Sequence, residues 1–140
     1  MTFSGQGTVV AVINLRPQDR FSNPKGYKLL PEHNVSYCSF NIDAPKESGI
    51  YWILVNQEIV YVGRAKSLHN RLSVQYGTVS PRHPFEGGQL QKCRTNAKIN
   101  TAICNGDLVS FRWLVCLDYV ECEQELLKDP EKRPPWNRRS

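Results

Sequence analysis

Two short motifs, Gly49-Ile50-Tyr51 and Tyr61-Val62-Gly63, place two tyrosines ten residues apart in the chain. Each motif lies in a run of β-branched and aromatic residues, and such runs, bounded by turn residues, are typical of β-strands. The pattern predicts a β-hairpin. Because side chains alternate between the two faces of a strand, Tyr51 and Tyr61 lie opposite one another on one face only if the turn between them has an odd number of residues. In that case two phenols meet at one place.

The chain has 140 residues, which suffice for one domain whose core needs neither a metal nor a disulfide to fold. Its five cysteines are odd in number and form no Cys-x-x-Cys pair, which argues against a zinc ribbon and against a secreted disulfide framework. The longest N-terminal apolar run, residues 9–13, is much shorter than a membrane span of about 20 residues. We therefore expect an intracellular, reduced protein without a membrane anchor.

Charge is distributed unevenly along the chain. Residues 118–131 contain six acidic side chains and one lysine, whereas residues 59–112 contain eight basic side chains and two acidic ones. The eight are Arg64, Lys66, Arg71, Arg82, Lys92, Arg94, Lys98 and Arg112. Such a basic region favours a polyanionic partner, and an acidic cluster beside it can hold a divalent cation against a phosphate. A solvated helix face explains the acidic cluster equally well.

The hydrophobic pattern predicts an α+β fold, in which helices flank a small three-stranded antiparallel sheet. The third strand is expected at residues 108–117, and helices are expected at residues 67–76, 90–104 and 120–128. Leu68, Leu72 and Tyr76 form an apolar stripe on the first of these helices, with Arg71 beside it. Residues 1–48 are expected to be an N-terminal extension that contains an added strand, and residues 49–140 to be the main domain.

The motifs and their spacing resemble those of the GIY-YIG nuclease family. The resemblance covers residues 49–137 and rests on the two tyrosine motifs, on Arg71, on an acidic helix and on an asparagine that follows Pro134-Pro135-Trp136. The helix inserted before the third strand and the Pro-Pro-Trp-Asn ending are most similar to small phage-type and type II restriction members. The resemblance implies a GIY-YIG fold for residues 49–140.

The resemblance also implies an activity. Members of the family are metal-dependent DNA endonucleases, so we expect phosphodiester hydrolysis of the restriction or phage type, with one Mg²⁺ or Mn²⁺ per active site and with 5′-phosphate and 3′-hydroxyl ends. DNA is then the partner, a homo-oligomer (dimer or tetramer) is expected, and the cytoplasm of a prokaryotic or phage-infected cell is the location. The alternatives are a structure-specific repair or recombination nuclease and a catalytically silent nucleic-acid-binding module.

Four residues have expected roles in hydrolysis. Tyr61 is the general base, since the cations of Arg71 or Lys66 favour its phenolate, and Tyr51 hydrogen-bonds beside it to orient the water. The planar fork of Arg71 grips the scissile phosphate. Asn137 fixes the wall of the site or a phosphate through its amide.

The metal ligand is expected on the acidic helix. A carboxylate oxygen suits a hard cation, and Leu126 and Leu127 follow Glu123 at i+3 and i+4, which selects Glu123. The usual interval to the asparagine in the family favours Glu125 instead, and Glu121 is a third choice. The expected phosphate contacts are Arg64, Lys66 and Lys98, and further basic side chains that could approach DNA include Arg138 and Arg139.

Overall fold

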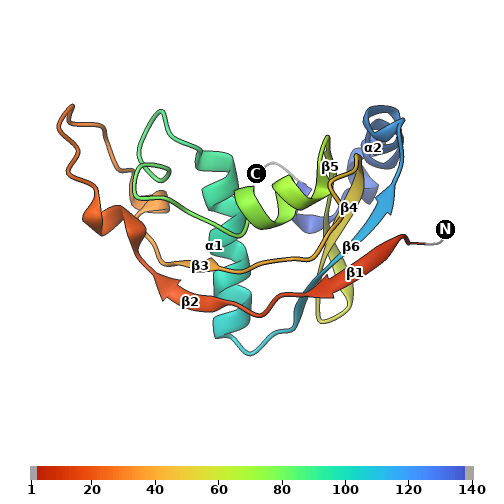
Figure 1. Cartoon of the computed structure of the whole chain (residues 1–140), viewed down its shortest axis with the longest axis horizontal. Helices are drawn as coiled ribbons and strands as arrows, with labels where there is room; N and C mark the ends of the chain where they lie inside the picture. Colours follow the sequence, from red (N-terminus) through yellow and green to blue (C-terminus); the bar gives the residue numbers. More distant parts are fainter. Residues whose placement is uncertain (1–2, 138–140) are drawn as a thin grey trace.

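The computed structural model describes residues 3–137, so the basic residues Arg138 and Arg139 lie outside the described part (Figure 1). The strands are β1 Gly5–Thr8, β2 Val12–Leu15, β3 Tyr37–Ser39, β4 Gly49–Val55, β5 Glu58–Ala65 and β6 Val109–Val115. The helices are α1 Leu90–Cys104, α2 Tyr119–Leu127 and a π-helix, η3 Asn70–Gln75, and the short 3₁₀ turns are η1 Pro17–Arg20, η2 Pro31–His33, η4 Pro130–Lys132 and η5 Pro135–Asn137. Within residues 3–137, every helix is too short or too polar to span a membrane.

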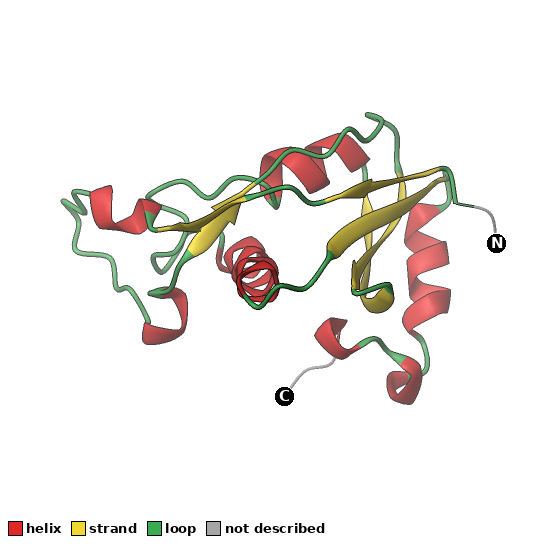
Figure 2. Ribbon diagram, turned by 90° about the horizontal axis from the view of Figure 1, so that it is seen from below, coloured by secondary structure: helices red, strands yellow, loops and turns green. Residues whose placement is uncertain are grey.

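Four strands form one antiparallel sheet in the order β1-β6-β4-β5, which leaves β5 at an edge. The predicted α+β fold is confirmed, and the sheet has a fourth strand because β1 pairs with β6. The N-terminal extension contributes three strands rather than one, since β1 ends at Thr8 and joins the main sheet, whereas β2 and β3 pair with each other. Strands β2 and β3 form a second small sheet, which contacts α1 (Figure 2). The domain boundary at residue 48 stays a prediction.

The hairpin of β4 and β5 has a two-residue turn and a β-bulge. Asn56 and Gln57 form the turn with positive φ angles of 51° and 70°, the left-handed conformation that tight hairpin turns require. Leu54 pairs with Ile59 but Ile53 pairs with Tyr61, so Val60 is an extra residue. An even turn alone would put Tyr61 on the face opposite Tyr51. The bulge, and not a turn with an odd number of residues, brings both tyrosines to one face.

The two faces of the four-stranded sheet are covered by different helices, with α1 and α2 on opposite sides (Figure 2). On the face that carries Tyr51, the stripe of Leu68, Leu72 and Tyr76 packs into the main core together with Ile99 of α1. On the other face, α2 packs against a smaller cluster that includes Trp52. The edge strand β5 is therefore the place where residues from both layers can meet.

Candidate active site at the sheet edge

At each of the two motif glycines, neighbouring atoms occupy the place that a side chain would fill. A Cβ on Gly63 would lie 2.4 Å from both Cζ and the hydroxyl oxygen of Tyr51, so the Tyr51 ring lies directly over this glycine. A Cβ on Gly49 would lie 2.2 Å from the carbonyl oxygen of Leu114 on the neighbouring strand. The glycines thus permit the close approach on which the position of Tyr51 depends.

Three tyrosines, and not two, form the centre of the site. The ring centroids of Tyr51 and Tyr61 are 6.0 Å apart, and those of Tyr51 and Tyr76 are 5.8 Å apart. The hydroxyls of Tyr51 and Tyr76 share a hydrogen bond of 2.6 Å. Tyr51 pairs with Gly63 rather than with Tyr61, so the two motif tyrosines are diagonal neighbours on one face and not directly opposite.

Tyr76 was predicted only as a member of an apolar stripe, and its hydroxyl makes it a residue of the site. Its position is set by the buried side chain of Asn96 on α1, whose amide nitrogen donates to the Tyr76 carbonyl at 2.6 Å. The same amide donates to the Cys38 carbonyl and accepts from the Cys38 N–H. Asn96 therefore fastens α1, β3 and the end of η3 together. A polar group in an otherwise apolar stripe was the one sequence signal for Tyr76.

Burial changes the acidity of the phenols. Burial is the main cause that raises the pKa of Tyr61, and its interaction with Tyr76 adds to the effect. The pKa of the fully buried Tyr51 is raised for the same reasons. The sequence suggested that Arg71 or Lys66 lowers the pKa of Tyr61. In the described structure the pKa is raised instead, so that prediction is wrong. Both phenols are neutral at pH 7 in the protein alone.

Arg71 lies at the start of η3 and has an unused donor. Its buried Nε has no hydrogen-bond partner among the described residues. Burial lowers the pKa of Arg71, but electrostatic interactions and hydrogen bonds with Tyr51 and Tyr76 raise it by more, so its pKa is above the usual value and the guanidinium stays charged. The Arg71 carbonyl accepts the π-helical hydrogen bond of the Tyr76 N–H at 3.0 Å, which ties the two residues together. An orphaned, buried and charged donor is a place where an anion is expected to bind.

Arg71 opens into a cleft of about 460 Å³. The side chains that line it are mostly polar or basic: Lys46, Ala65, Lys66, Ser67, Asn70, Arg71 and Gln75. Lys66 thus lies in the same cleft as Arg71, as its expected role requires. Lys98 lies elsewhere, on the exposed side of α1.

Glu123 is the helix acid that faces the sheet. Its carboxylate lies 3.6 Å from the Arg64 guanidinium on β5, and its side chain is 19% exposed. It is also close enough to Tyr61 to raise the pKa of that phenol. Glu125, by contrast, is exposed and bonds Lys128 at 2.7 Å, while Glu121 is exposed. The helix register thus directs Glu123 toward β5 and the tyrosines.

Asn137 bonds the free edge of β5. Its amide accepts from the Val62 N–H at 2.8 Å and donates to the Val62 carbonyl at 2.9 Å. Both bonds go to backbone groups, so Asn137 holds η5 against the strand next to Tyr61. This geometry is in keeping with the expected wall of the site, and the second N–H of the amide is not used in these two bonds.

Comparison with known proteins supports the fold. The structure of a mutant of bacteriophage T4 EndoII is similar over 94% of this chain and 91% of that chain, with a TM-score of 0.53 and 21% sequence identity. A segment of 38 residues is 45% identical to UvrABC system protein C of Fusobacterium nucleatum and spans 27% of this chain but 6% of that protein. No protein-family model matches the chain. The predicted resemblance to the GIY-YIG nucleases is confirmed at the level of the fold.

Proposed function

We propose that the protein is a divalent-metal-dependent DNA endonuclease that hydrolyses phosphodiester bonds at the free edge of β5. The observation that carries this proposal is the convergence of a charged Arg71, whose Nε has no hydrogen-bond partner among the described residues, with three tyrosines and one inward-facing carboxylate. The fold shared with T4 EndoII and the short segment shared with UvrABC system protein C are in keeping with it. The products are a 5′-phosphate and a 3′-hydroxyl, as in restriction or phage-type cleavage.

Arg71 binds the scissile phosphate. Its Nε lacks a partner in the protein, so a phosphate oxygen supplies the missing acceptor, and the planar guanidinium can engage a second oxygen. Lys66 in the same cleft adds a second positive charge. As negative charge develops on the phosphorus oxygens in the transition state, these donors stabilise it without having to reorganise.

Glu123 would hold the metal ion. Its carboxylate offers hard oxygen ligands, and its contact with Arg64 at 3.6 Å is longer than a hydrogen bond, so the carboxylate can turn to a cation. When bound there, Mg²⁺ or Mn²⁺ would supply Lewis-acid stabilisation of the charge on the phosphate and on the leaving oxygen. Arg64 on β5 would contact a neighbouring phosphate.

Tyr61 orients the attacking water and, once its own proton has passed to solvent, accepts a proton from that water. Because burial raises the pKa of Tyr61, its resting form is the neutral phenol, whose oxygen can accept a hydrogen bond from water. The loss of the phenol proton therefore limits the population of active enzyme at neutral pH. The Tyr51 ring contacts the Tyr61 ring in a tilted arrangement, and Tyr51 is itself fixed by its edge contact and its hydrogen bond with Tyr76.

A cleavage assay tests the proposal. Purified protein is incubated with plasmid and with branched oligonucleotides, in Mg²⁺ or in chelator. We expect cleavage in Mg²⁺ alone and a loss of about 10²- to 10⁴-fold in Tyr61→Phe, Arg71→Ala and Glu123→Gln. The matched controls Arg20→Ala and Glu125→Gln change exposed residues and keep full activity.

The same assay separates the alternatives. Preference for branched substrates over plasmid favours a repair or recombination nuclease. DNA binding without cleavage on every substrate, in Mg²⁺ and in Mn²⁺, would leave only a nucleic-acid-binding module. If Glu125→Gln loses activity and Glu123→Gln does not, the metal ligand is Glu125.

A further inference from the structure

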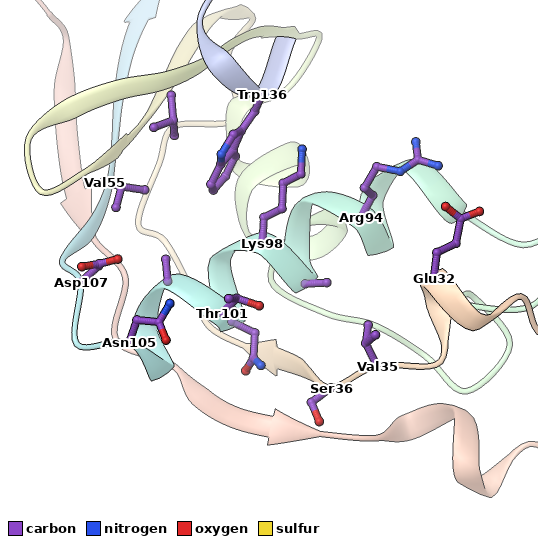
Figure 3. A pocket seen from close by; sticks show the side chains of 14 residues that line it. Glu32, Val35, Ser36, Val55, Arg94, Lys98, Thr101, Asn105, Asp107 and Trp136 are labelled. Atoms are coloured by element: carbon purple, nitrogen blue, oxygen red, sulfur yellow. The ribbon is translucent and has the colours of Figure 1, made fainter. Parts of the chain in front are cut away.

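A second and larger opening lies beside the candidate site, between β5 and α1. It measures about 640 Å³, within the range of small-molecule sites. Val60 of the β5 bulge and Ala97 of α1 line it. Trp136 lines it from η5 (Figure 3). Since Val60 directly precedes Tyr61, the opening begins next to the candidate catalytic tyrosine.

Trp136 gives this pocket an aromatic wall. Of the three tryptophans, Trp52 and Trp113 are 6% and 5% exposed, whereas Trp136 is only half-buried. The neighbouring Asn137 fixes η5 to β5 through its two hydrogen bonds to Val62, so the indole is held on a rigid base. An indole presented in this way offers a flat surface for stacking.

The opposite wall of the pocket is basic. Lys98 places its ammonium 5.5 Å from the centroid of the Trp136 ring, and Arg94 lies one helical turn before Lys98 (Figure 3). Two acids, Glu32 and Asp107, also line the pocket. Among the described residues neither of them forms an ion pair with Lys98 or Arg94. The cations beside Trp136 are therefore available to an anion.

We propose that this pocket binds one unstacked nucleotide of the substrate strand, with its base on Trp136 and its phosphate on Lys98 and Arg94. A nucleotide combines a flat aromatic base with an anionic group, as the two walls require. Thr101 and Asn105 line the floor and can hydrogen-bond a base edge. This inference rests on the proposed function, because it specifies the substrate of the nuclease. That substrate is a DNA strand in which one base is unstacked beside the cleaved bond.

Tryptophan fluorescence tests the pocket directly, without cleavage. Wild-type protein in chelator is titrated with a single-stranded oligodeoxynucleotide of about ten nucleotides. We expect quenching of Trp136 emission on binding. Trp136→Phe is expected to lose the quenching while it keeps an aromatic wall. Trp136→Leu is expected to weaken binding about 5- to 150-fold. Lys98→Ala is expected to reduce the slope of the logarithm of the binding constant against the logarithm of the salt concentration by about one. Lys25→Ala, which changes an exposed loop residue, is the control.

The outcomes distinguish this inference from the proposed function. Unchanged affinity in Trp136→Leu, with a wild-type thermal melting temperature, would overturn the pocket even if the protein cuts DNA. Quenching that persists in Trp136→Phe would do the same, because a buried tryptophan would then be the reporter. Quenching without cleavage in any metal would retain the pocket and refute the nuclease.

A different observation supports a second site, on the other face of the sheet. Cys116, Asp118 and Cys122 place their two sulfur atoms and a carboxylate oxygen within 4.8 Å of one another. The backbone of Cys116 is fixed by Ser48, which accepts from its N–H at 3.0 Å and donates to its carbonyl at 2.9 Å. Cys122 lies in the first turn of α2, where its N–H bonds the Asp118 carbonyl at 3.0 Å.

We infer that these three side chains bind a zinc ion. Two thiolates and a carboxylate form a three-ligand set that Zn²⁺ accepts, with a fourth position open to solvent because Asp118 and Leu117 are exposed. Each thiol gives up its proton when it binds the metal. The ion would join the end of β6 to the first turn of α2, the helix that carries Glu123.

Metal titration tests this site on the reduced, full-length protein. We expect one Zn²⁺ per chain in competition with a chromogenic chelator, and a thiolate charge-transfer absorption on titration with Cd²⁺. Both signals are lost in Cys116→Ser and in Cys122→Ser and persist in Cys104→Ser, an exposed cysteine on α1. Equal zinc uptake by wild type and by the Cys116→Ser/Cys122→Ser double variant would overturn the inference.

Discussion

Single atoms decide the geometry of the tyrosine cluster. Two contacts fix the Tyr51 ring. Its hydroxyl shares a hydrogen bond of 2.6 Å with Tyr76, and the ring lies over Gly63, where a Cβ would overlap it. The unpartnered Nε of Arg71 is then the one buried cationic donor with no acceptor in the described part of the chain. Residue chemistry of this kind makes the site a candidate for anion binding.

At the residue scale, Gly63→Ala is expected to destabilise the protein by about 1–3 kcal/mol, because the new methyl group overlaps the Tyr51 ring. Denaturant unfolding measures the change. Gly7→Ala is the control, since its Cβ would meet Ile42 at 3.4 Å, an ordinary contact, and should shift the free energy of unfolding by less than about 0.5 kcal/mol. Equal effects at the two glycines would contradict the close packing.

The raised pKa of Tyr61 predicts the pH dependence of cleavage. A base must lose its proton to act, so a raised pKa means that the active fraction is small at neutral pH and grows with each added pH unit. We expect the rate to rise from neutral pH to about pH 9 without a plateau. In Tyr61→Phe the residual rate loses this slope. A wild-type plateau below about pH 8 would show that the phenol titrates lower than its burial implies.

Elements hold the site residues in register. The bulge at Val60 turns Tyr61 to the face of Tyr51, which a two-residue turn alone would not do. The π-helix η3 links Arg71 to Tyr76 by a backbone hydrogen bond. One asparagine of α1, Asn96, bonds both the end of η3 and β3. The bulge and the π-helix each change the local period of a regular element. Such irregularities are common next to active sites, where they re-aim a side chain.

Asn96→Ala is expected to destabilise the protein by about 2–4 kcal/mol, because it leaves the buried Cys38 N–H and the carbonyls of Cys38 and Tyr76 without their partner. Thermal or denaturant unfolding measures the loss. Asn105→Ala, at the exposed end of the same helix, is the matched control and should change the free energy of unfolding by less than about 0.5 kcal/mol.

Asn137→Ala is expected to free η5 from the edge of β5. The loss of two hydrogen bonds to Val62 should lower the free energy of unfolding by about 1–2 kcal/mol. It should also expose Trp136 further, which a red shift of emission and stronger acrylamide quenching would detect. Asn41→Ala, an exposed asparagine, should change neither. Unchanged emission in Asn137→Ala would mean that other contacts hold η5.

On the scale of the whole molecule, the basic cleft includes Arg71 of η3, and the basic wall of the larger pocket belongs to α1, whose Asn96 bonds Tyr76 at the end of η3. We expect a single strand of the substrate to contact both. The sheet edge carries one candidate site per chain, so the cutting of both DNA strands by one assembly needs a second copy.

We propose that the protein acts as a dimer, or as a tetramer built from dimers. Sedimentation is expected to give twice the monomer mass or more, and plasmid is expected to be linearised without accumulation of nicked circles. A monomer that releases nicked circles would refute the proposed assembly and leave the chemistry of the site untouched.

The sequence by itself determined the hairpin, the glycines, Arg71 and the α+β fold, because strand periodicity and the need for glycine at close approaches are local properties. It also selected Glu123 over Glu125, since a helix register fixes which acid faces the sheet, and the structure directs Glu123 toward β5 as that register implies.

The tertiary structure alone decided three features: the bulge that turns Tyr61 to the face of Tyr51, the hydroxyl of Tyr76 beside them, and the direction of the Tyr61 pKa. Apart from the polar group of Tyr76 in an apolar stripe, none of them has a local signal. A bulge depends on how two strands are paired, a hydrogen bond between residues 51 and 76 depends on how a helix packs on the sheet, and a pKa depends on how much water the surrounding side chains exclude.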